Sequence, residues 1–277
     1  MELWTLVAAI SGTLAGGLLA HNFRGRQEWT GFFLLALSLV GLLTSHGISR
    51  VEAADSTRKY EWNWAKEFYE EIERIRKDAV LWLAVIANTF FWCLGAILLL
   101  NVVLYATDVL QVDEAHSSYL LAVLSLGIGV GSFMAGYASG KKIETGMILP
   151  GLTGIVLLSG ALAVPGLTYG ALMGLLGLLG VCAGFFVVPV NALIQNRPRP
   201  EMKEQVIGAA NLLSFGGIAL QPLMRYAMMQ LGHPDPGRVF RICAVACLGV
   251  LVVLPRMSPE LWPSALYWTR LKHRVTL

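Results

Sequence analysis

The residues of this chain that could do chemistry are polar groups inside long apolar runs. Six of them are carboxamides and one is a guanidinium: Asn88, Asn101, Asn191, Gln195, Asn211, Gln221 and Arg225. An amide in hydrocarbon is costly unless it is paired, so each must face another helix, a cavity or a ligand. For any single amide, hydrogen bonding between helices is the favoured interpretation. Seven such groups together favour at least one that lines a polar path.

Arg225 is the most informative of these groups because it carries a permanent charge. A guanidinium can hold a phosphate or a carboxylate through a forked pair of hydrogen bonds. The alternative is structural, because an arginine near the outer end of a membrane helix can extend its charge to the membrane surface. Pro222 follows Gln221 directly, which predicts a kink just before Arg225 and a freed backbone carbonyl.

Groups that carry out catalysis are not found in the apolar runs. They contain no Asp or Glu away from their ends, whereas proton-coupled carriers usually titrate such a carboxylate inside the membrane. Ser45 and His46 adjoin at a membrane edge without an acid in sequence reach. The four cysteines lie inside apolar runs without a Cys-x-x-Cys pair, so no disulfide framework or zinc site is predicted. We therefore expect no enzyme activity, no metal and no cofactor.

The composition indicates that the chain carrying these groups is a membrane protein. Of 277 residues, 56% are hydrophobic and 14% are charged, and the mean hydropathy is +0.62. An ordinary soluble domain has about 25% charged residues, spread along the chain, whereas the charges here gather in a few short stretches. The formal net charge of +3 is too small to favour a nucleic acid partner. We expect membrane lipids as the surroundings and no nucleic acid.

The apolar runs predict about eight transmembrane helices in an all-α membrane protein. A helix needs about 20 apolar residues to cross a bilayer core of about 30 Å. The predicted spans are Leu3 to Ala20, Thr30 to Ile48, Val80 to Thr107, Ser117 to Ser139, Met147 to Val164, Leu167 to Ile194, Val206 to Leu231 and Val239 to Leu254. The loops on one face carry sixteen Lys and Arg residues and those on the other face carry four. The positive-inside rule then places both termini in the cytoplasm.

One long polar stretch, residues 49–78, separates the second span from the third. Its second half, from Trp62 to Asp78, has helical periodicity, and its apolar residues share one face: Trp64, Phe68, Ile72 and Ile75. We expect an amphipathic helix at the cytoplasmic membrane surface, with the rings of Trp62 and Trp64 at headgroup level. A solvated helical linker is the alternative.

Glycines recur inside the spans at Gly127, Gly129 and Gly131, and again at Gly154, Gly160, Gly174, Gly177 and Gly180. The first three imitate part of a dinucleotide fingerprint, but that motif needs a strand before it and a helix after it outside lipid. Small residues at such spacing let helix backbones approach closely, which is how helices associate in membranes. We interpret these glycines as packing positions.

Two stretches of the sequence resemble a known family. They are Trp82 to Glu144, and Gly184 to Pro222, which contains the segment PVNALIQ, a short basic loop and an AAN segment. Both are similar to the major facilitator superfamily, in particular its lysophospholipid transporter branch. In many bacteria that branch is fused ahead of a glycerophospholipid acyltransferase and an acyl carrier protein ligase. The tail from Leu266 to Leu277 resembles the linker into that acyltransferase, and the likeness covers nearly the whole chain.

The resemblance implies a partial major facilitator fold. The family has twelve helices in two six-helix bundles, with a long cytoplasmic loop between helices six and seven. Here the long polar stretch follows the second span, so the spans correspond to helices five to twelve and the first four helices are not in the chain. Residues 1–48 would then be the end of the N-terminal bundle, 49–78 the interdomain loop, 79–256 the C-terminal six-helix bundle and 257–277 a cytoplasmic tail.

The resemblance also places a cytoplasmic gate loop at residues 136–146, from Gly136 to Gly146. Gly140 stands where the family usually has an Asp, while Lys141 and Lys142 keep the positive charge. This departure argues against a charge-relay gate and favours a tight turn with basic anchors.

In function, the resemblance implies a carrier that moves lysophospholipid, such as lysophosphatidylethanolamine, to the cytoplasmic leaflet of the bacterial inner membrane. Its path would need an apolar wall and a few polar groups. The candidate substrate-binding residues are Asn88, Trp92, Asn101, Asn191, Gln195, Asn211, Gln221 and Arg225. Two alternatives stay open: a carrier of another small amphiphile, and a non-transporting membrane subunit for an acyltransferase partner or for a lost fusion domain.

Overall fold

The fold is seen in a computed structural model, which describes residues 8, 11–12, 15–16, 18–19, 22–23, 26–48, 64–140, 144–230 and 235–257. Every regular element among these residues is a helix. The first predicted span, Leu3 to Ala20, lies mostly outside the described residues. Most of the polar stretch before residue 64 and the tail after residue 257 also lie outside them.

Seven helical stretches of the described residues are long and apolar enough to cross a membrane. They are α2 (Gln27–Ser45), α4 (Ala79–Leu104) continued by the π-helical turn η1 (Tyr105–Val109), α5 (Glu114–Ser139), the 3-10 turn η2 (Thr145–Met147) with α6 (Ile148–Leu162), α7 (Tyr169–Asn196), α8 (Lys203–Ala219) with α9 (Gln221–Gln230), and α10 (Pro236–Met257). They match seven of the eight predicted spans within a few residues. The prediction of an all-α, multi-pass membrane protein is confirmed.

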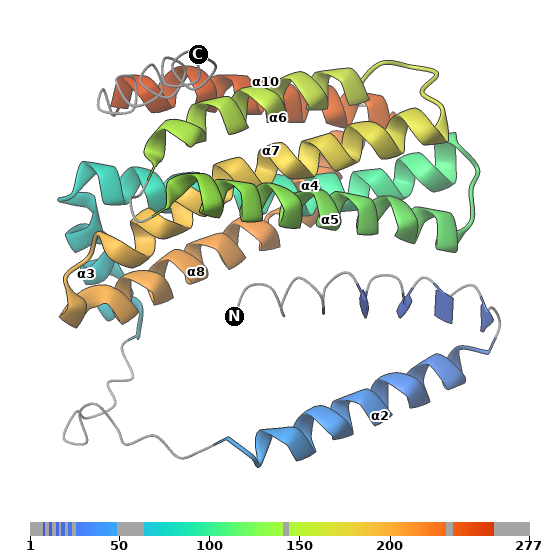
Figure 1. Ribbon diagram of the computed structural model, residues 1–277, viewed down its shortest axis with the longest axis horizontal. Helices are drawn as coiled ribbons and strands as arrows, with labels where there is room; N and C mark the ends of the chain where they lie inside the picture. Colours follow the sequence, from blue (N-terminus) through green and yellow to red (C-terminus); the bar gives the residue numbers. More distant parts are fainter. Residues whose placement is uncertain are drawn as a thin grey trace.

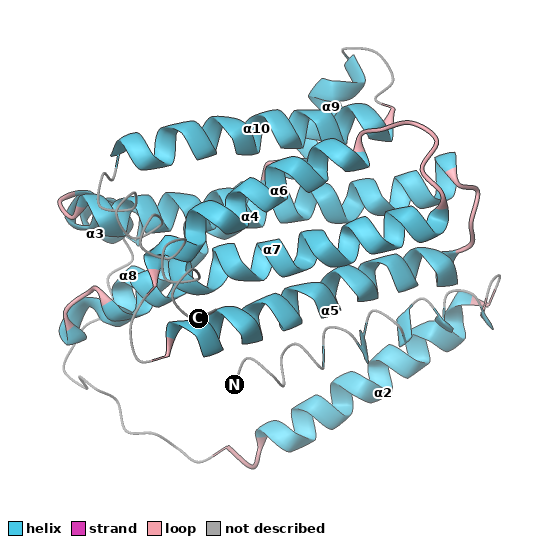
Figure 2. Ribbon diagram, turned by 45° about the horizontal axis from the view of Figure 1, so that its top comes forward, coloured by secondary structure: helices cyan, strands magenta, loops and turns pink. Residues whose placement is uncertain are grey.

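Helices α4 to α10 pack into one bundle, and α2 lies outside it (Figures 1 and 2). None of the residues in the span Glu28–Ser45 is buried. Large apolar side chains such as Phe32 and Leu43 are therefore more than half exposed along α2. Such a surface is stable only against lipid or against other protein helices.

The tightest contact in the bundle joins α5 to α7, and glycines make it possible. A methyl group on Gly127 would collide with the carbonyl oxygen of Gly177, and one on Gly131 with that of Val181. From the other side, a methyl group on Gly180 would strike the backbone of Leu124. The two backbones therefore meet without side chains between them, as small residues allow in membranes.

The packing interpretation is confirmed for Gly127, Gly131, Gly154, Gly177 and Gly180, each of which faces a neighbouring helix closely. It is wrong for Gly160 and Gly174, where a methyl group would meet nothing within 4 Å. Spacing alone does not separate the two kinds, because a glycine on the outer face of a helix has the same sequence pattern as one on the inner face.

The amphipathic helix predicted in the polar stretch is α3 (Trp64–Arg76). Its apolar face points to protein rather than to lipid: Ile75 is 1% exposed, and Phe68 and Ile72 pack against the bundle core. The expected surface helix with its apolar face in the bilayer is therefore wrong in this respect. The ends of α4 and α8 supply enough apolar surface to cover that face, and Figure 1 shows α3 at this end of the bundle. Trp62 lies outside the described residues.

Asp78 fixes the elbow between α3 and α4. Its carboxylate accepts hydrogen bonds from the backbone N–H groups of Val80 and Leu81, which caps α4. The guanidinium of Arg197, at the end of α7, donates to the other carboxylate oxygen at 2.7 Å. The elbow is thereby tied to the loop that leads through the 3-10 turn η3 (Pro200–Met202) into α8.

Candidate functional site

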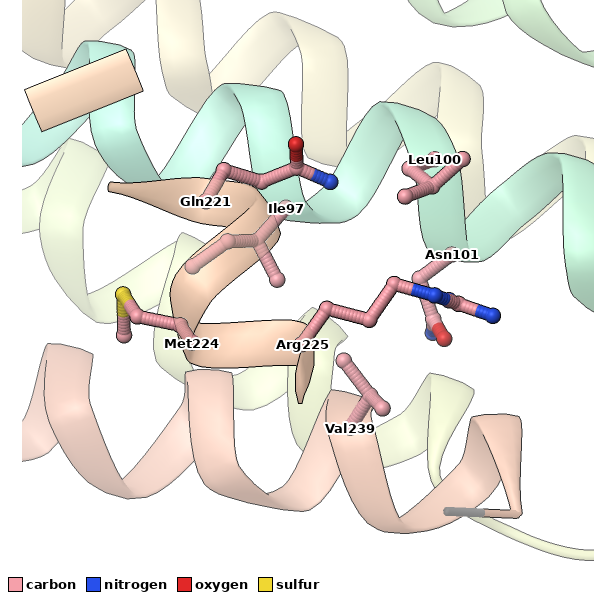
Figure 3. Close-up of a pocket in the computed structure, with 7 residues that line it drawn as sticks. All are labelled: Ile97, Leu100, Asn101, Gln221, Met224, Arg225 and Val239. Carbon is pink, nitrogen blue, oxygen red and sulfur yellow. The ribbon is translucent and has the colours of Figure 1, made fainter. Parts of the chain in front are cut away.

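Three of the predicted site residues meet in one pocket between α4, α9 and α10. Figure 3 shows its lining, which consists of Ile97, Leu100, Asn101, Gln221, Met224, Arg225 and Val239. The pocket has a volume of about 20 Å³. A single water needs about 10–15 Å³ of such space, so the pocket as it stands holds little more than one water. It is a small hollow that is partly open to the outside, so a larger ligand would lie across its open side.

The break between α8 and α9 is what turns Gln221 and Arg225 towards the pocket. Helix α8 ends at Ala219 and α9 begins at Gln221, so the predicted kink before Arg225 is confirmed. Pro222 has no backbone N–H, so it cannot continue the hydrogen-bond ladder of α8 through this point. Gln221 and Arg225 are four residues apart and lie on one face of α9, the face that looks onto α4 (Figure 3).

Asn101 joins two helices at the pocket. Its side chain is 3% exposed, and its amide nitrogen donates to the backbone carbonyl of Pro236 at the start of α10, at 3.0 Å. This hydrogen bond holds the end of α4 to α10 and fixes the amide beside the Arg225 side chain (Figure 3).

Arg225 is a cation without a carboxylate partner among the residues that the structure describes. Its side chain is partly buried and extends past Val239 towards Asn101 (Figure 3). A guanidinium in apolar surroundings is stabilised by an anion, and its planar fork matches a phosphate or a carboxylate. The guanidinium can therefore hold an anionic group.

Asn88 belongs to a different part of α4, where its amide nitrogen is bonded to α8 and its amide oxygen has no partner in the described residues. It is 3% exposed, and its amide nitrogen donates to the Ser214 hydroxyl on α8 at 3.0 Å. Ser214 in turn donates to the carbonyl of Ala210 at 2.9 Å. Thirteen residues separate Asn88 from Asn101, which is about 20 Å along a helix. The two amides of α4 therefore serve separate contacts.

The remaining candidates do not join the Arg225 pocket. Asn191 and Gln195 lie in the last two turns of α7, near the end of the bundle where Arg197 meets Asp78. Asn211 is exposed on α8. Trp92 is 46% exposed and packs edge-on against Phe91, so it faces away from the core. The structure does not gather the eight predicted residues into one site.

The predicted gate loop is shorter than expected. Helix α5 continues through Gly136 to Ser139, so Gly136 lies in the helix and not in the loop. The turn begins at Gly140, whose φ of 56° lies in the left-handed region that favours glycine. This agrees with a tight turn at Gly140. Lys141 and Lys142 lie outside the described residues.

Three contacts near these residues were not predicted. Asp78 directly precedes an apolar run, which is the pattern of a helix cap, so its capping role could have been found from the sequence. Its ion pair with Arg197 could not, because 119 residues separate the two. The Ser214 partner of Asn88 also gave no signal, because serines are common in these helices.

Comparisons with known proteins indicate the family to which the chain is related. The sequence pattern of the Major Facilitator Superfamily matches residues 1–222. The lysophospholipid transporter LplT of Escherichia coli O157:H7 (strain EC4115 / EHEC) is 30% identical over 223 residues, which are 77% of this chain and 52% of that protein. LplT of Pectobacterium carotovorum subsp. carotovorum (strain PC1) is 29% identical over 244 residues, which are 84% of this chain and 56% of that protein.

The chain thus spans about half the length of the curated relatives it matches. The family match covers most of the chain, and it includes α2, the glycine contact of α5 with α7, and the start of α9. Together with seven helices able to cross a membrane, it identifies the chain as a member of the Major Facilitator Superfamily.

Proposed function

We propose that this chain takes part in moving lysophospholipid across the bacterial inner membrane towards the cytoplasmic leaflet. The relatives that carry the name lysophospholipid transporter support the substrate class. A lysophospholipid has one acyl chain and a phosphate-bearing headgroup, so its path needs an apolar wall with few polar contacts. The pocket of Asn101, Gln221 and Arg225 has this character.

The single observation that carries the proposal is the Arg225 guanidinium, partly buried among apolar side chains and without a carboxylate partner in the described part of the chain. Its charge complements the phosphate of the headgroup, while Asn101 and Gln221 can hydrogen-bond to phosphate or glycerol oxygens. Because the pocket is small and partly open, the headgroup would lie across its open side, with its phosphate on Arg225.

The proposal includes downhill movement rather than proton coupling. The spans contain no Asp or Glu away from their ends, so they offer no buried carboxylate that titrates near neutral pH. Consumption of lysophospholipid by an acyltransferase in the cytoplasm would supply the gradient. The chain itself acts as a transporter and not as an enzyme.

A transport assay in liposomes tests the proposal. The purified chain is reconstituted, and the appearance of labelled lysophosphatidylethanolamine in the opposite leaflet is followed. Arg225→Ala should slow transport about tenfold, the loss expected for one charge-assisted hydrogen bond. Arg241→Ala is the matched control, because Arg241 is exposed on α10 and lies outside the pocket. Unchanged transport by a well-expressed Arg225→Ala protein would show that the charge only reaches the membrane surface.

A second candidate is a membrane subunit that anchors an acyltransferase without transporting lipid. It is favoured by the packing of α4 to α10 into one bundle, because alternating access needs two bundles that rock against each other. The same liposomes decide between the two functions. A chain that transports only together with a protein that supplies the remaining helices of its relatives is a part of a carrier, and a chain that never transports but retains an acyltransferase is an anchor.

A further inference from the structure

A second hollow lies at the other end of the bundle, between α3 and the first turns of α8. Its volume is about 270 Å³, far larger than that of the Arg225 pocket. Helix α3 contributes Glu67, Glu70, Glu71 and Arg74 to its lining, and α8 contributes Gly208 and Leu212. We call it the α3–α8 groove.

Glu71 is the unusual residue of the groove. Its side chain is 8% exposed, yet only one of its carboxylate oxygens has a partner, the Arg74 guanidinium at 3.3 Å. The other oxygen is buried and accepts no hydrogen bond in the described part of the chain. A buried, half-satisfied carboxylate costs free energy, which a ligand with a hydrogen-bond donor would recover.

The charges that line the groove indicate the charge of the ligand's hydrogen-bond donor. Three carboxylates and one guanidinium line it, so its potential favours a cation. No group of described residues has the arrangement that a metal ion needs, which points to an organic cation instead. Arg74, 49% exposed beside Glu71, offers in addition a site for an anion. A cationic and an anionic subsite a few ångströms apart match a zwitterion.

The apolar walls of the groove indicate that the zwitterion carries an apolar group. Phe68 of α3 and Leu212 of α8 give the groove an apolar side. Gly208 borders the open space of the groove, because a methyl group there would meet nothing within 4 Å. Leu212 is nine residues from the start of α8 at Lys203, about 13 Å into the helix, so the groove runs from the polar helix end towards the apolar span.

We infer that the α3–α8 groove binds the ethanolamine phosphate headgroup of a lysophospholipid, with the ammonium group on Glu71 and the phosphate on Arg74. The acyl chain would lie along Leu212 towards the membrane. This inference rests on the proposed function for the identity of the lipid, and it adds a headgroup site at the end of the bundle opposite to Arg225. The free oxygen of Glu71 then accepts from the ammonium group and the exposed side of Arg74 donates to the phosphate, while the Glu71–Arg74 ion pair stays in place.

Lipid binding to the full chain in detergent micelles tests the inference. The two ligands are lysophosphatidylethanolamine and lysophosphatidylglycerol, which share the phosphate but differ in the ammonium group. Glu71→Gln should weaken binding of the ethanolamine lipid about tenfold and leave the glycerol lipid unchanged, since one charge-assisted contact is lost. Gly208→Leu should weaken both lipids by filling the groove. The matched control is Glu73→Gln, an exposed glutamate of α3 outside the groove.

Thermal stability separates a binding role of Glu71 from a structural one. Glutamine has the same size, can still accept from the half-exposed Arg74 and carries no buried charge, so the unfolding temperature of ligand-free Glu71→Gln should stay equal or rise. A lower unfolding temperature with an unchanged preference between the lipids would overturn the inference. Equal losses in Glu71→Gln and Glu73→Gln would also overturn it.

The outcomes keep the two proposals apart. Lipid-selective binding that depends on Glu71, in a chain that does not transport, refutes the proposed transport and supports the groove. Transport that depends on Arg225, with lipid binding indifferent to both Glu71→Gln and Gly208→Leu, refutes the groove and supports the transport.

Discussion

At the scale of single residues, polar groups inside the bundle have two kinds of environment. Asn88 and Asn101 are buried and donate to neighbouring helices, so they stabilise helix contacts. Arg225 is partly buried and has no carboxylate partner in the described residues, which is why we propose it as the contact for the headgroup phosphate. A hydrogen bond between helices in a membrane is worth only about 0.6 kcal/mol on average, so removing such a bond should affect stability mildly.

Asn88→Leu therefore should lower the free energy of unfolding by about 0.6 kcal/mol and leave lipid transport unchanged, because Ser214 keeps its bond to Ala210. Unfolding in detergent and the liposome assay measure the two effects. Asn101→Leu is the comparison, since it removes both a helix contact and a wall of the Arg225 pocket, so it should also slow transport. A strong transport defect in Asn88→Leu at normal stability would place Asn88 on the substrate path.

At the scale of elements, the contact between α5 and α7 depends on backbone approach. Gly131→Ala should destabilise the bundle by about 1–3 kcal/mol, because the added methyl group meets the backbone of Val181 and forces the helices apart. Gly174→Ala is the matched control on α7. It has open space and should be neutral, or stabilising by up to about 1 kcal/mol through helix propensity. Equal unfolding temperatures for the two variants would contradict this account of the contact.

The elbow between α3 and α4 has a pH dependence. Burial of Asp78 would raise its pKa, but the hydrogen bond and the charge of Arg197, with two backbone N–H donors, together hold the pKa below its ordinary value of 3.8. A lowered pKa in the folded state adds stability above the ordinary pKa, and this is lost as the pH falls through the folded-state value. The carboxylate is partly exposed, so the effect is modest.

Asp78→Asn should therefore lower the unfolding temperature by the same amount at every pH from about 5 to 8, and the gap to the unsubstituted protein should narrow only below pH 3.8. Thermal unfolding in detergent across this range measures the gap. A gap that closes near pH 6 instead would mean that another group, and not Asp78, carries the titration.

At the scale of the whole molecule, the helices alternate so that their connections gather at two ends (Figure 1). The end of α7 lies with the start of α4, as the Arg197 to Asp78 contact shows. The connection between α6 and α7, around Val164, lies at the opposite end. The Lys and Arg count predicts that the first of these ends is cytoplasmic.

Cysteines introduced as Asn196→Cys and Val164→Cys should therefore react with a membrane-impermeant thiol reagent from opposite sides of the membrane. Both positions are exposed and lie outside the packed core. Labelling of Val164→Cys from outside intact cells, with Asn196→Cys protected until lysis, is the expected result. The unsubstituted chain, whose four cysteines lie within the spans, is the blank. Reversed labelling would invert the predicted orientation.

The sequence by itself determined the class of protein, the positions of the spans and the kink before Arg225. These features depend on local properties: the length of an apolar run, the scarcity of charges within it, and the missing N–H of Pro222. The apolar face of α3 could be predicted for the same reason. The partner that covers this face could not be predicted, because the periodicity of α3 is the same whether Ile75 contacts lipid or the ends of α4 and α8.

Only the tertiary structure decided which residues meet. It brought Asn101, Gln221 and Arg225 into one pocket, paired Asn88 with Ser214 across 126 residues, and left Trp92 and Asn211 on the outside. It also separated Gly131, which touches a backbone, from Gly174, which touches nothing. The physical reason is that helix packing fixes rotation and depth for each helix. Those two quantities come from contacts between residues far apart in the sequence, which local patterns do not record.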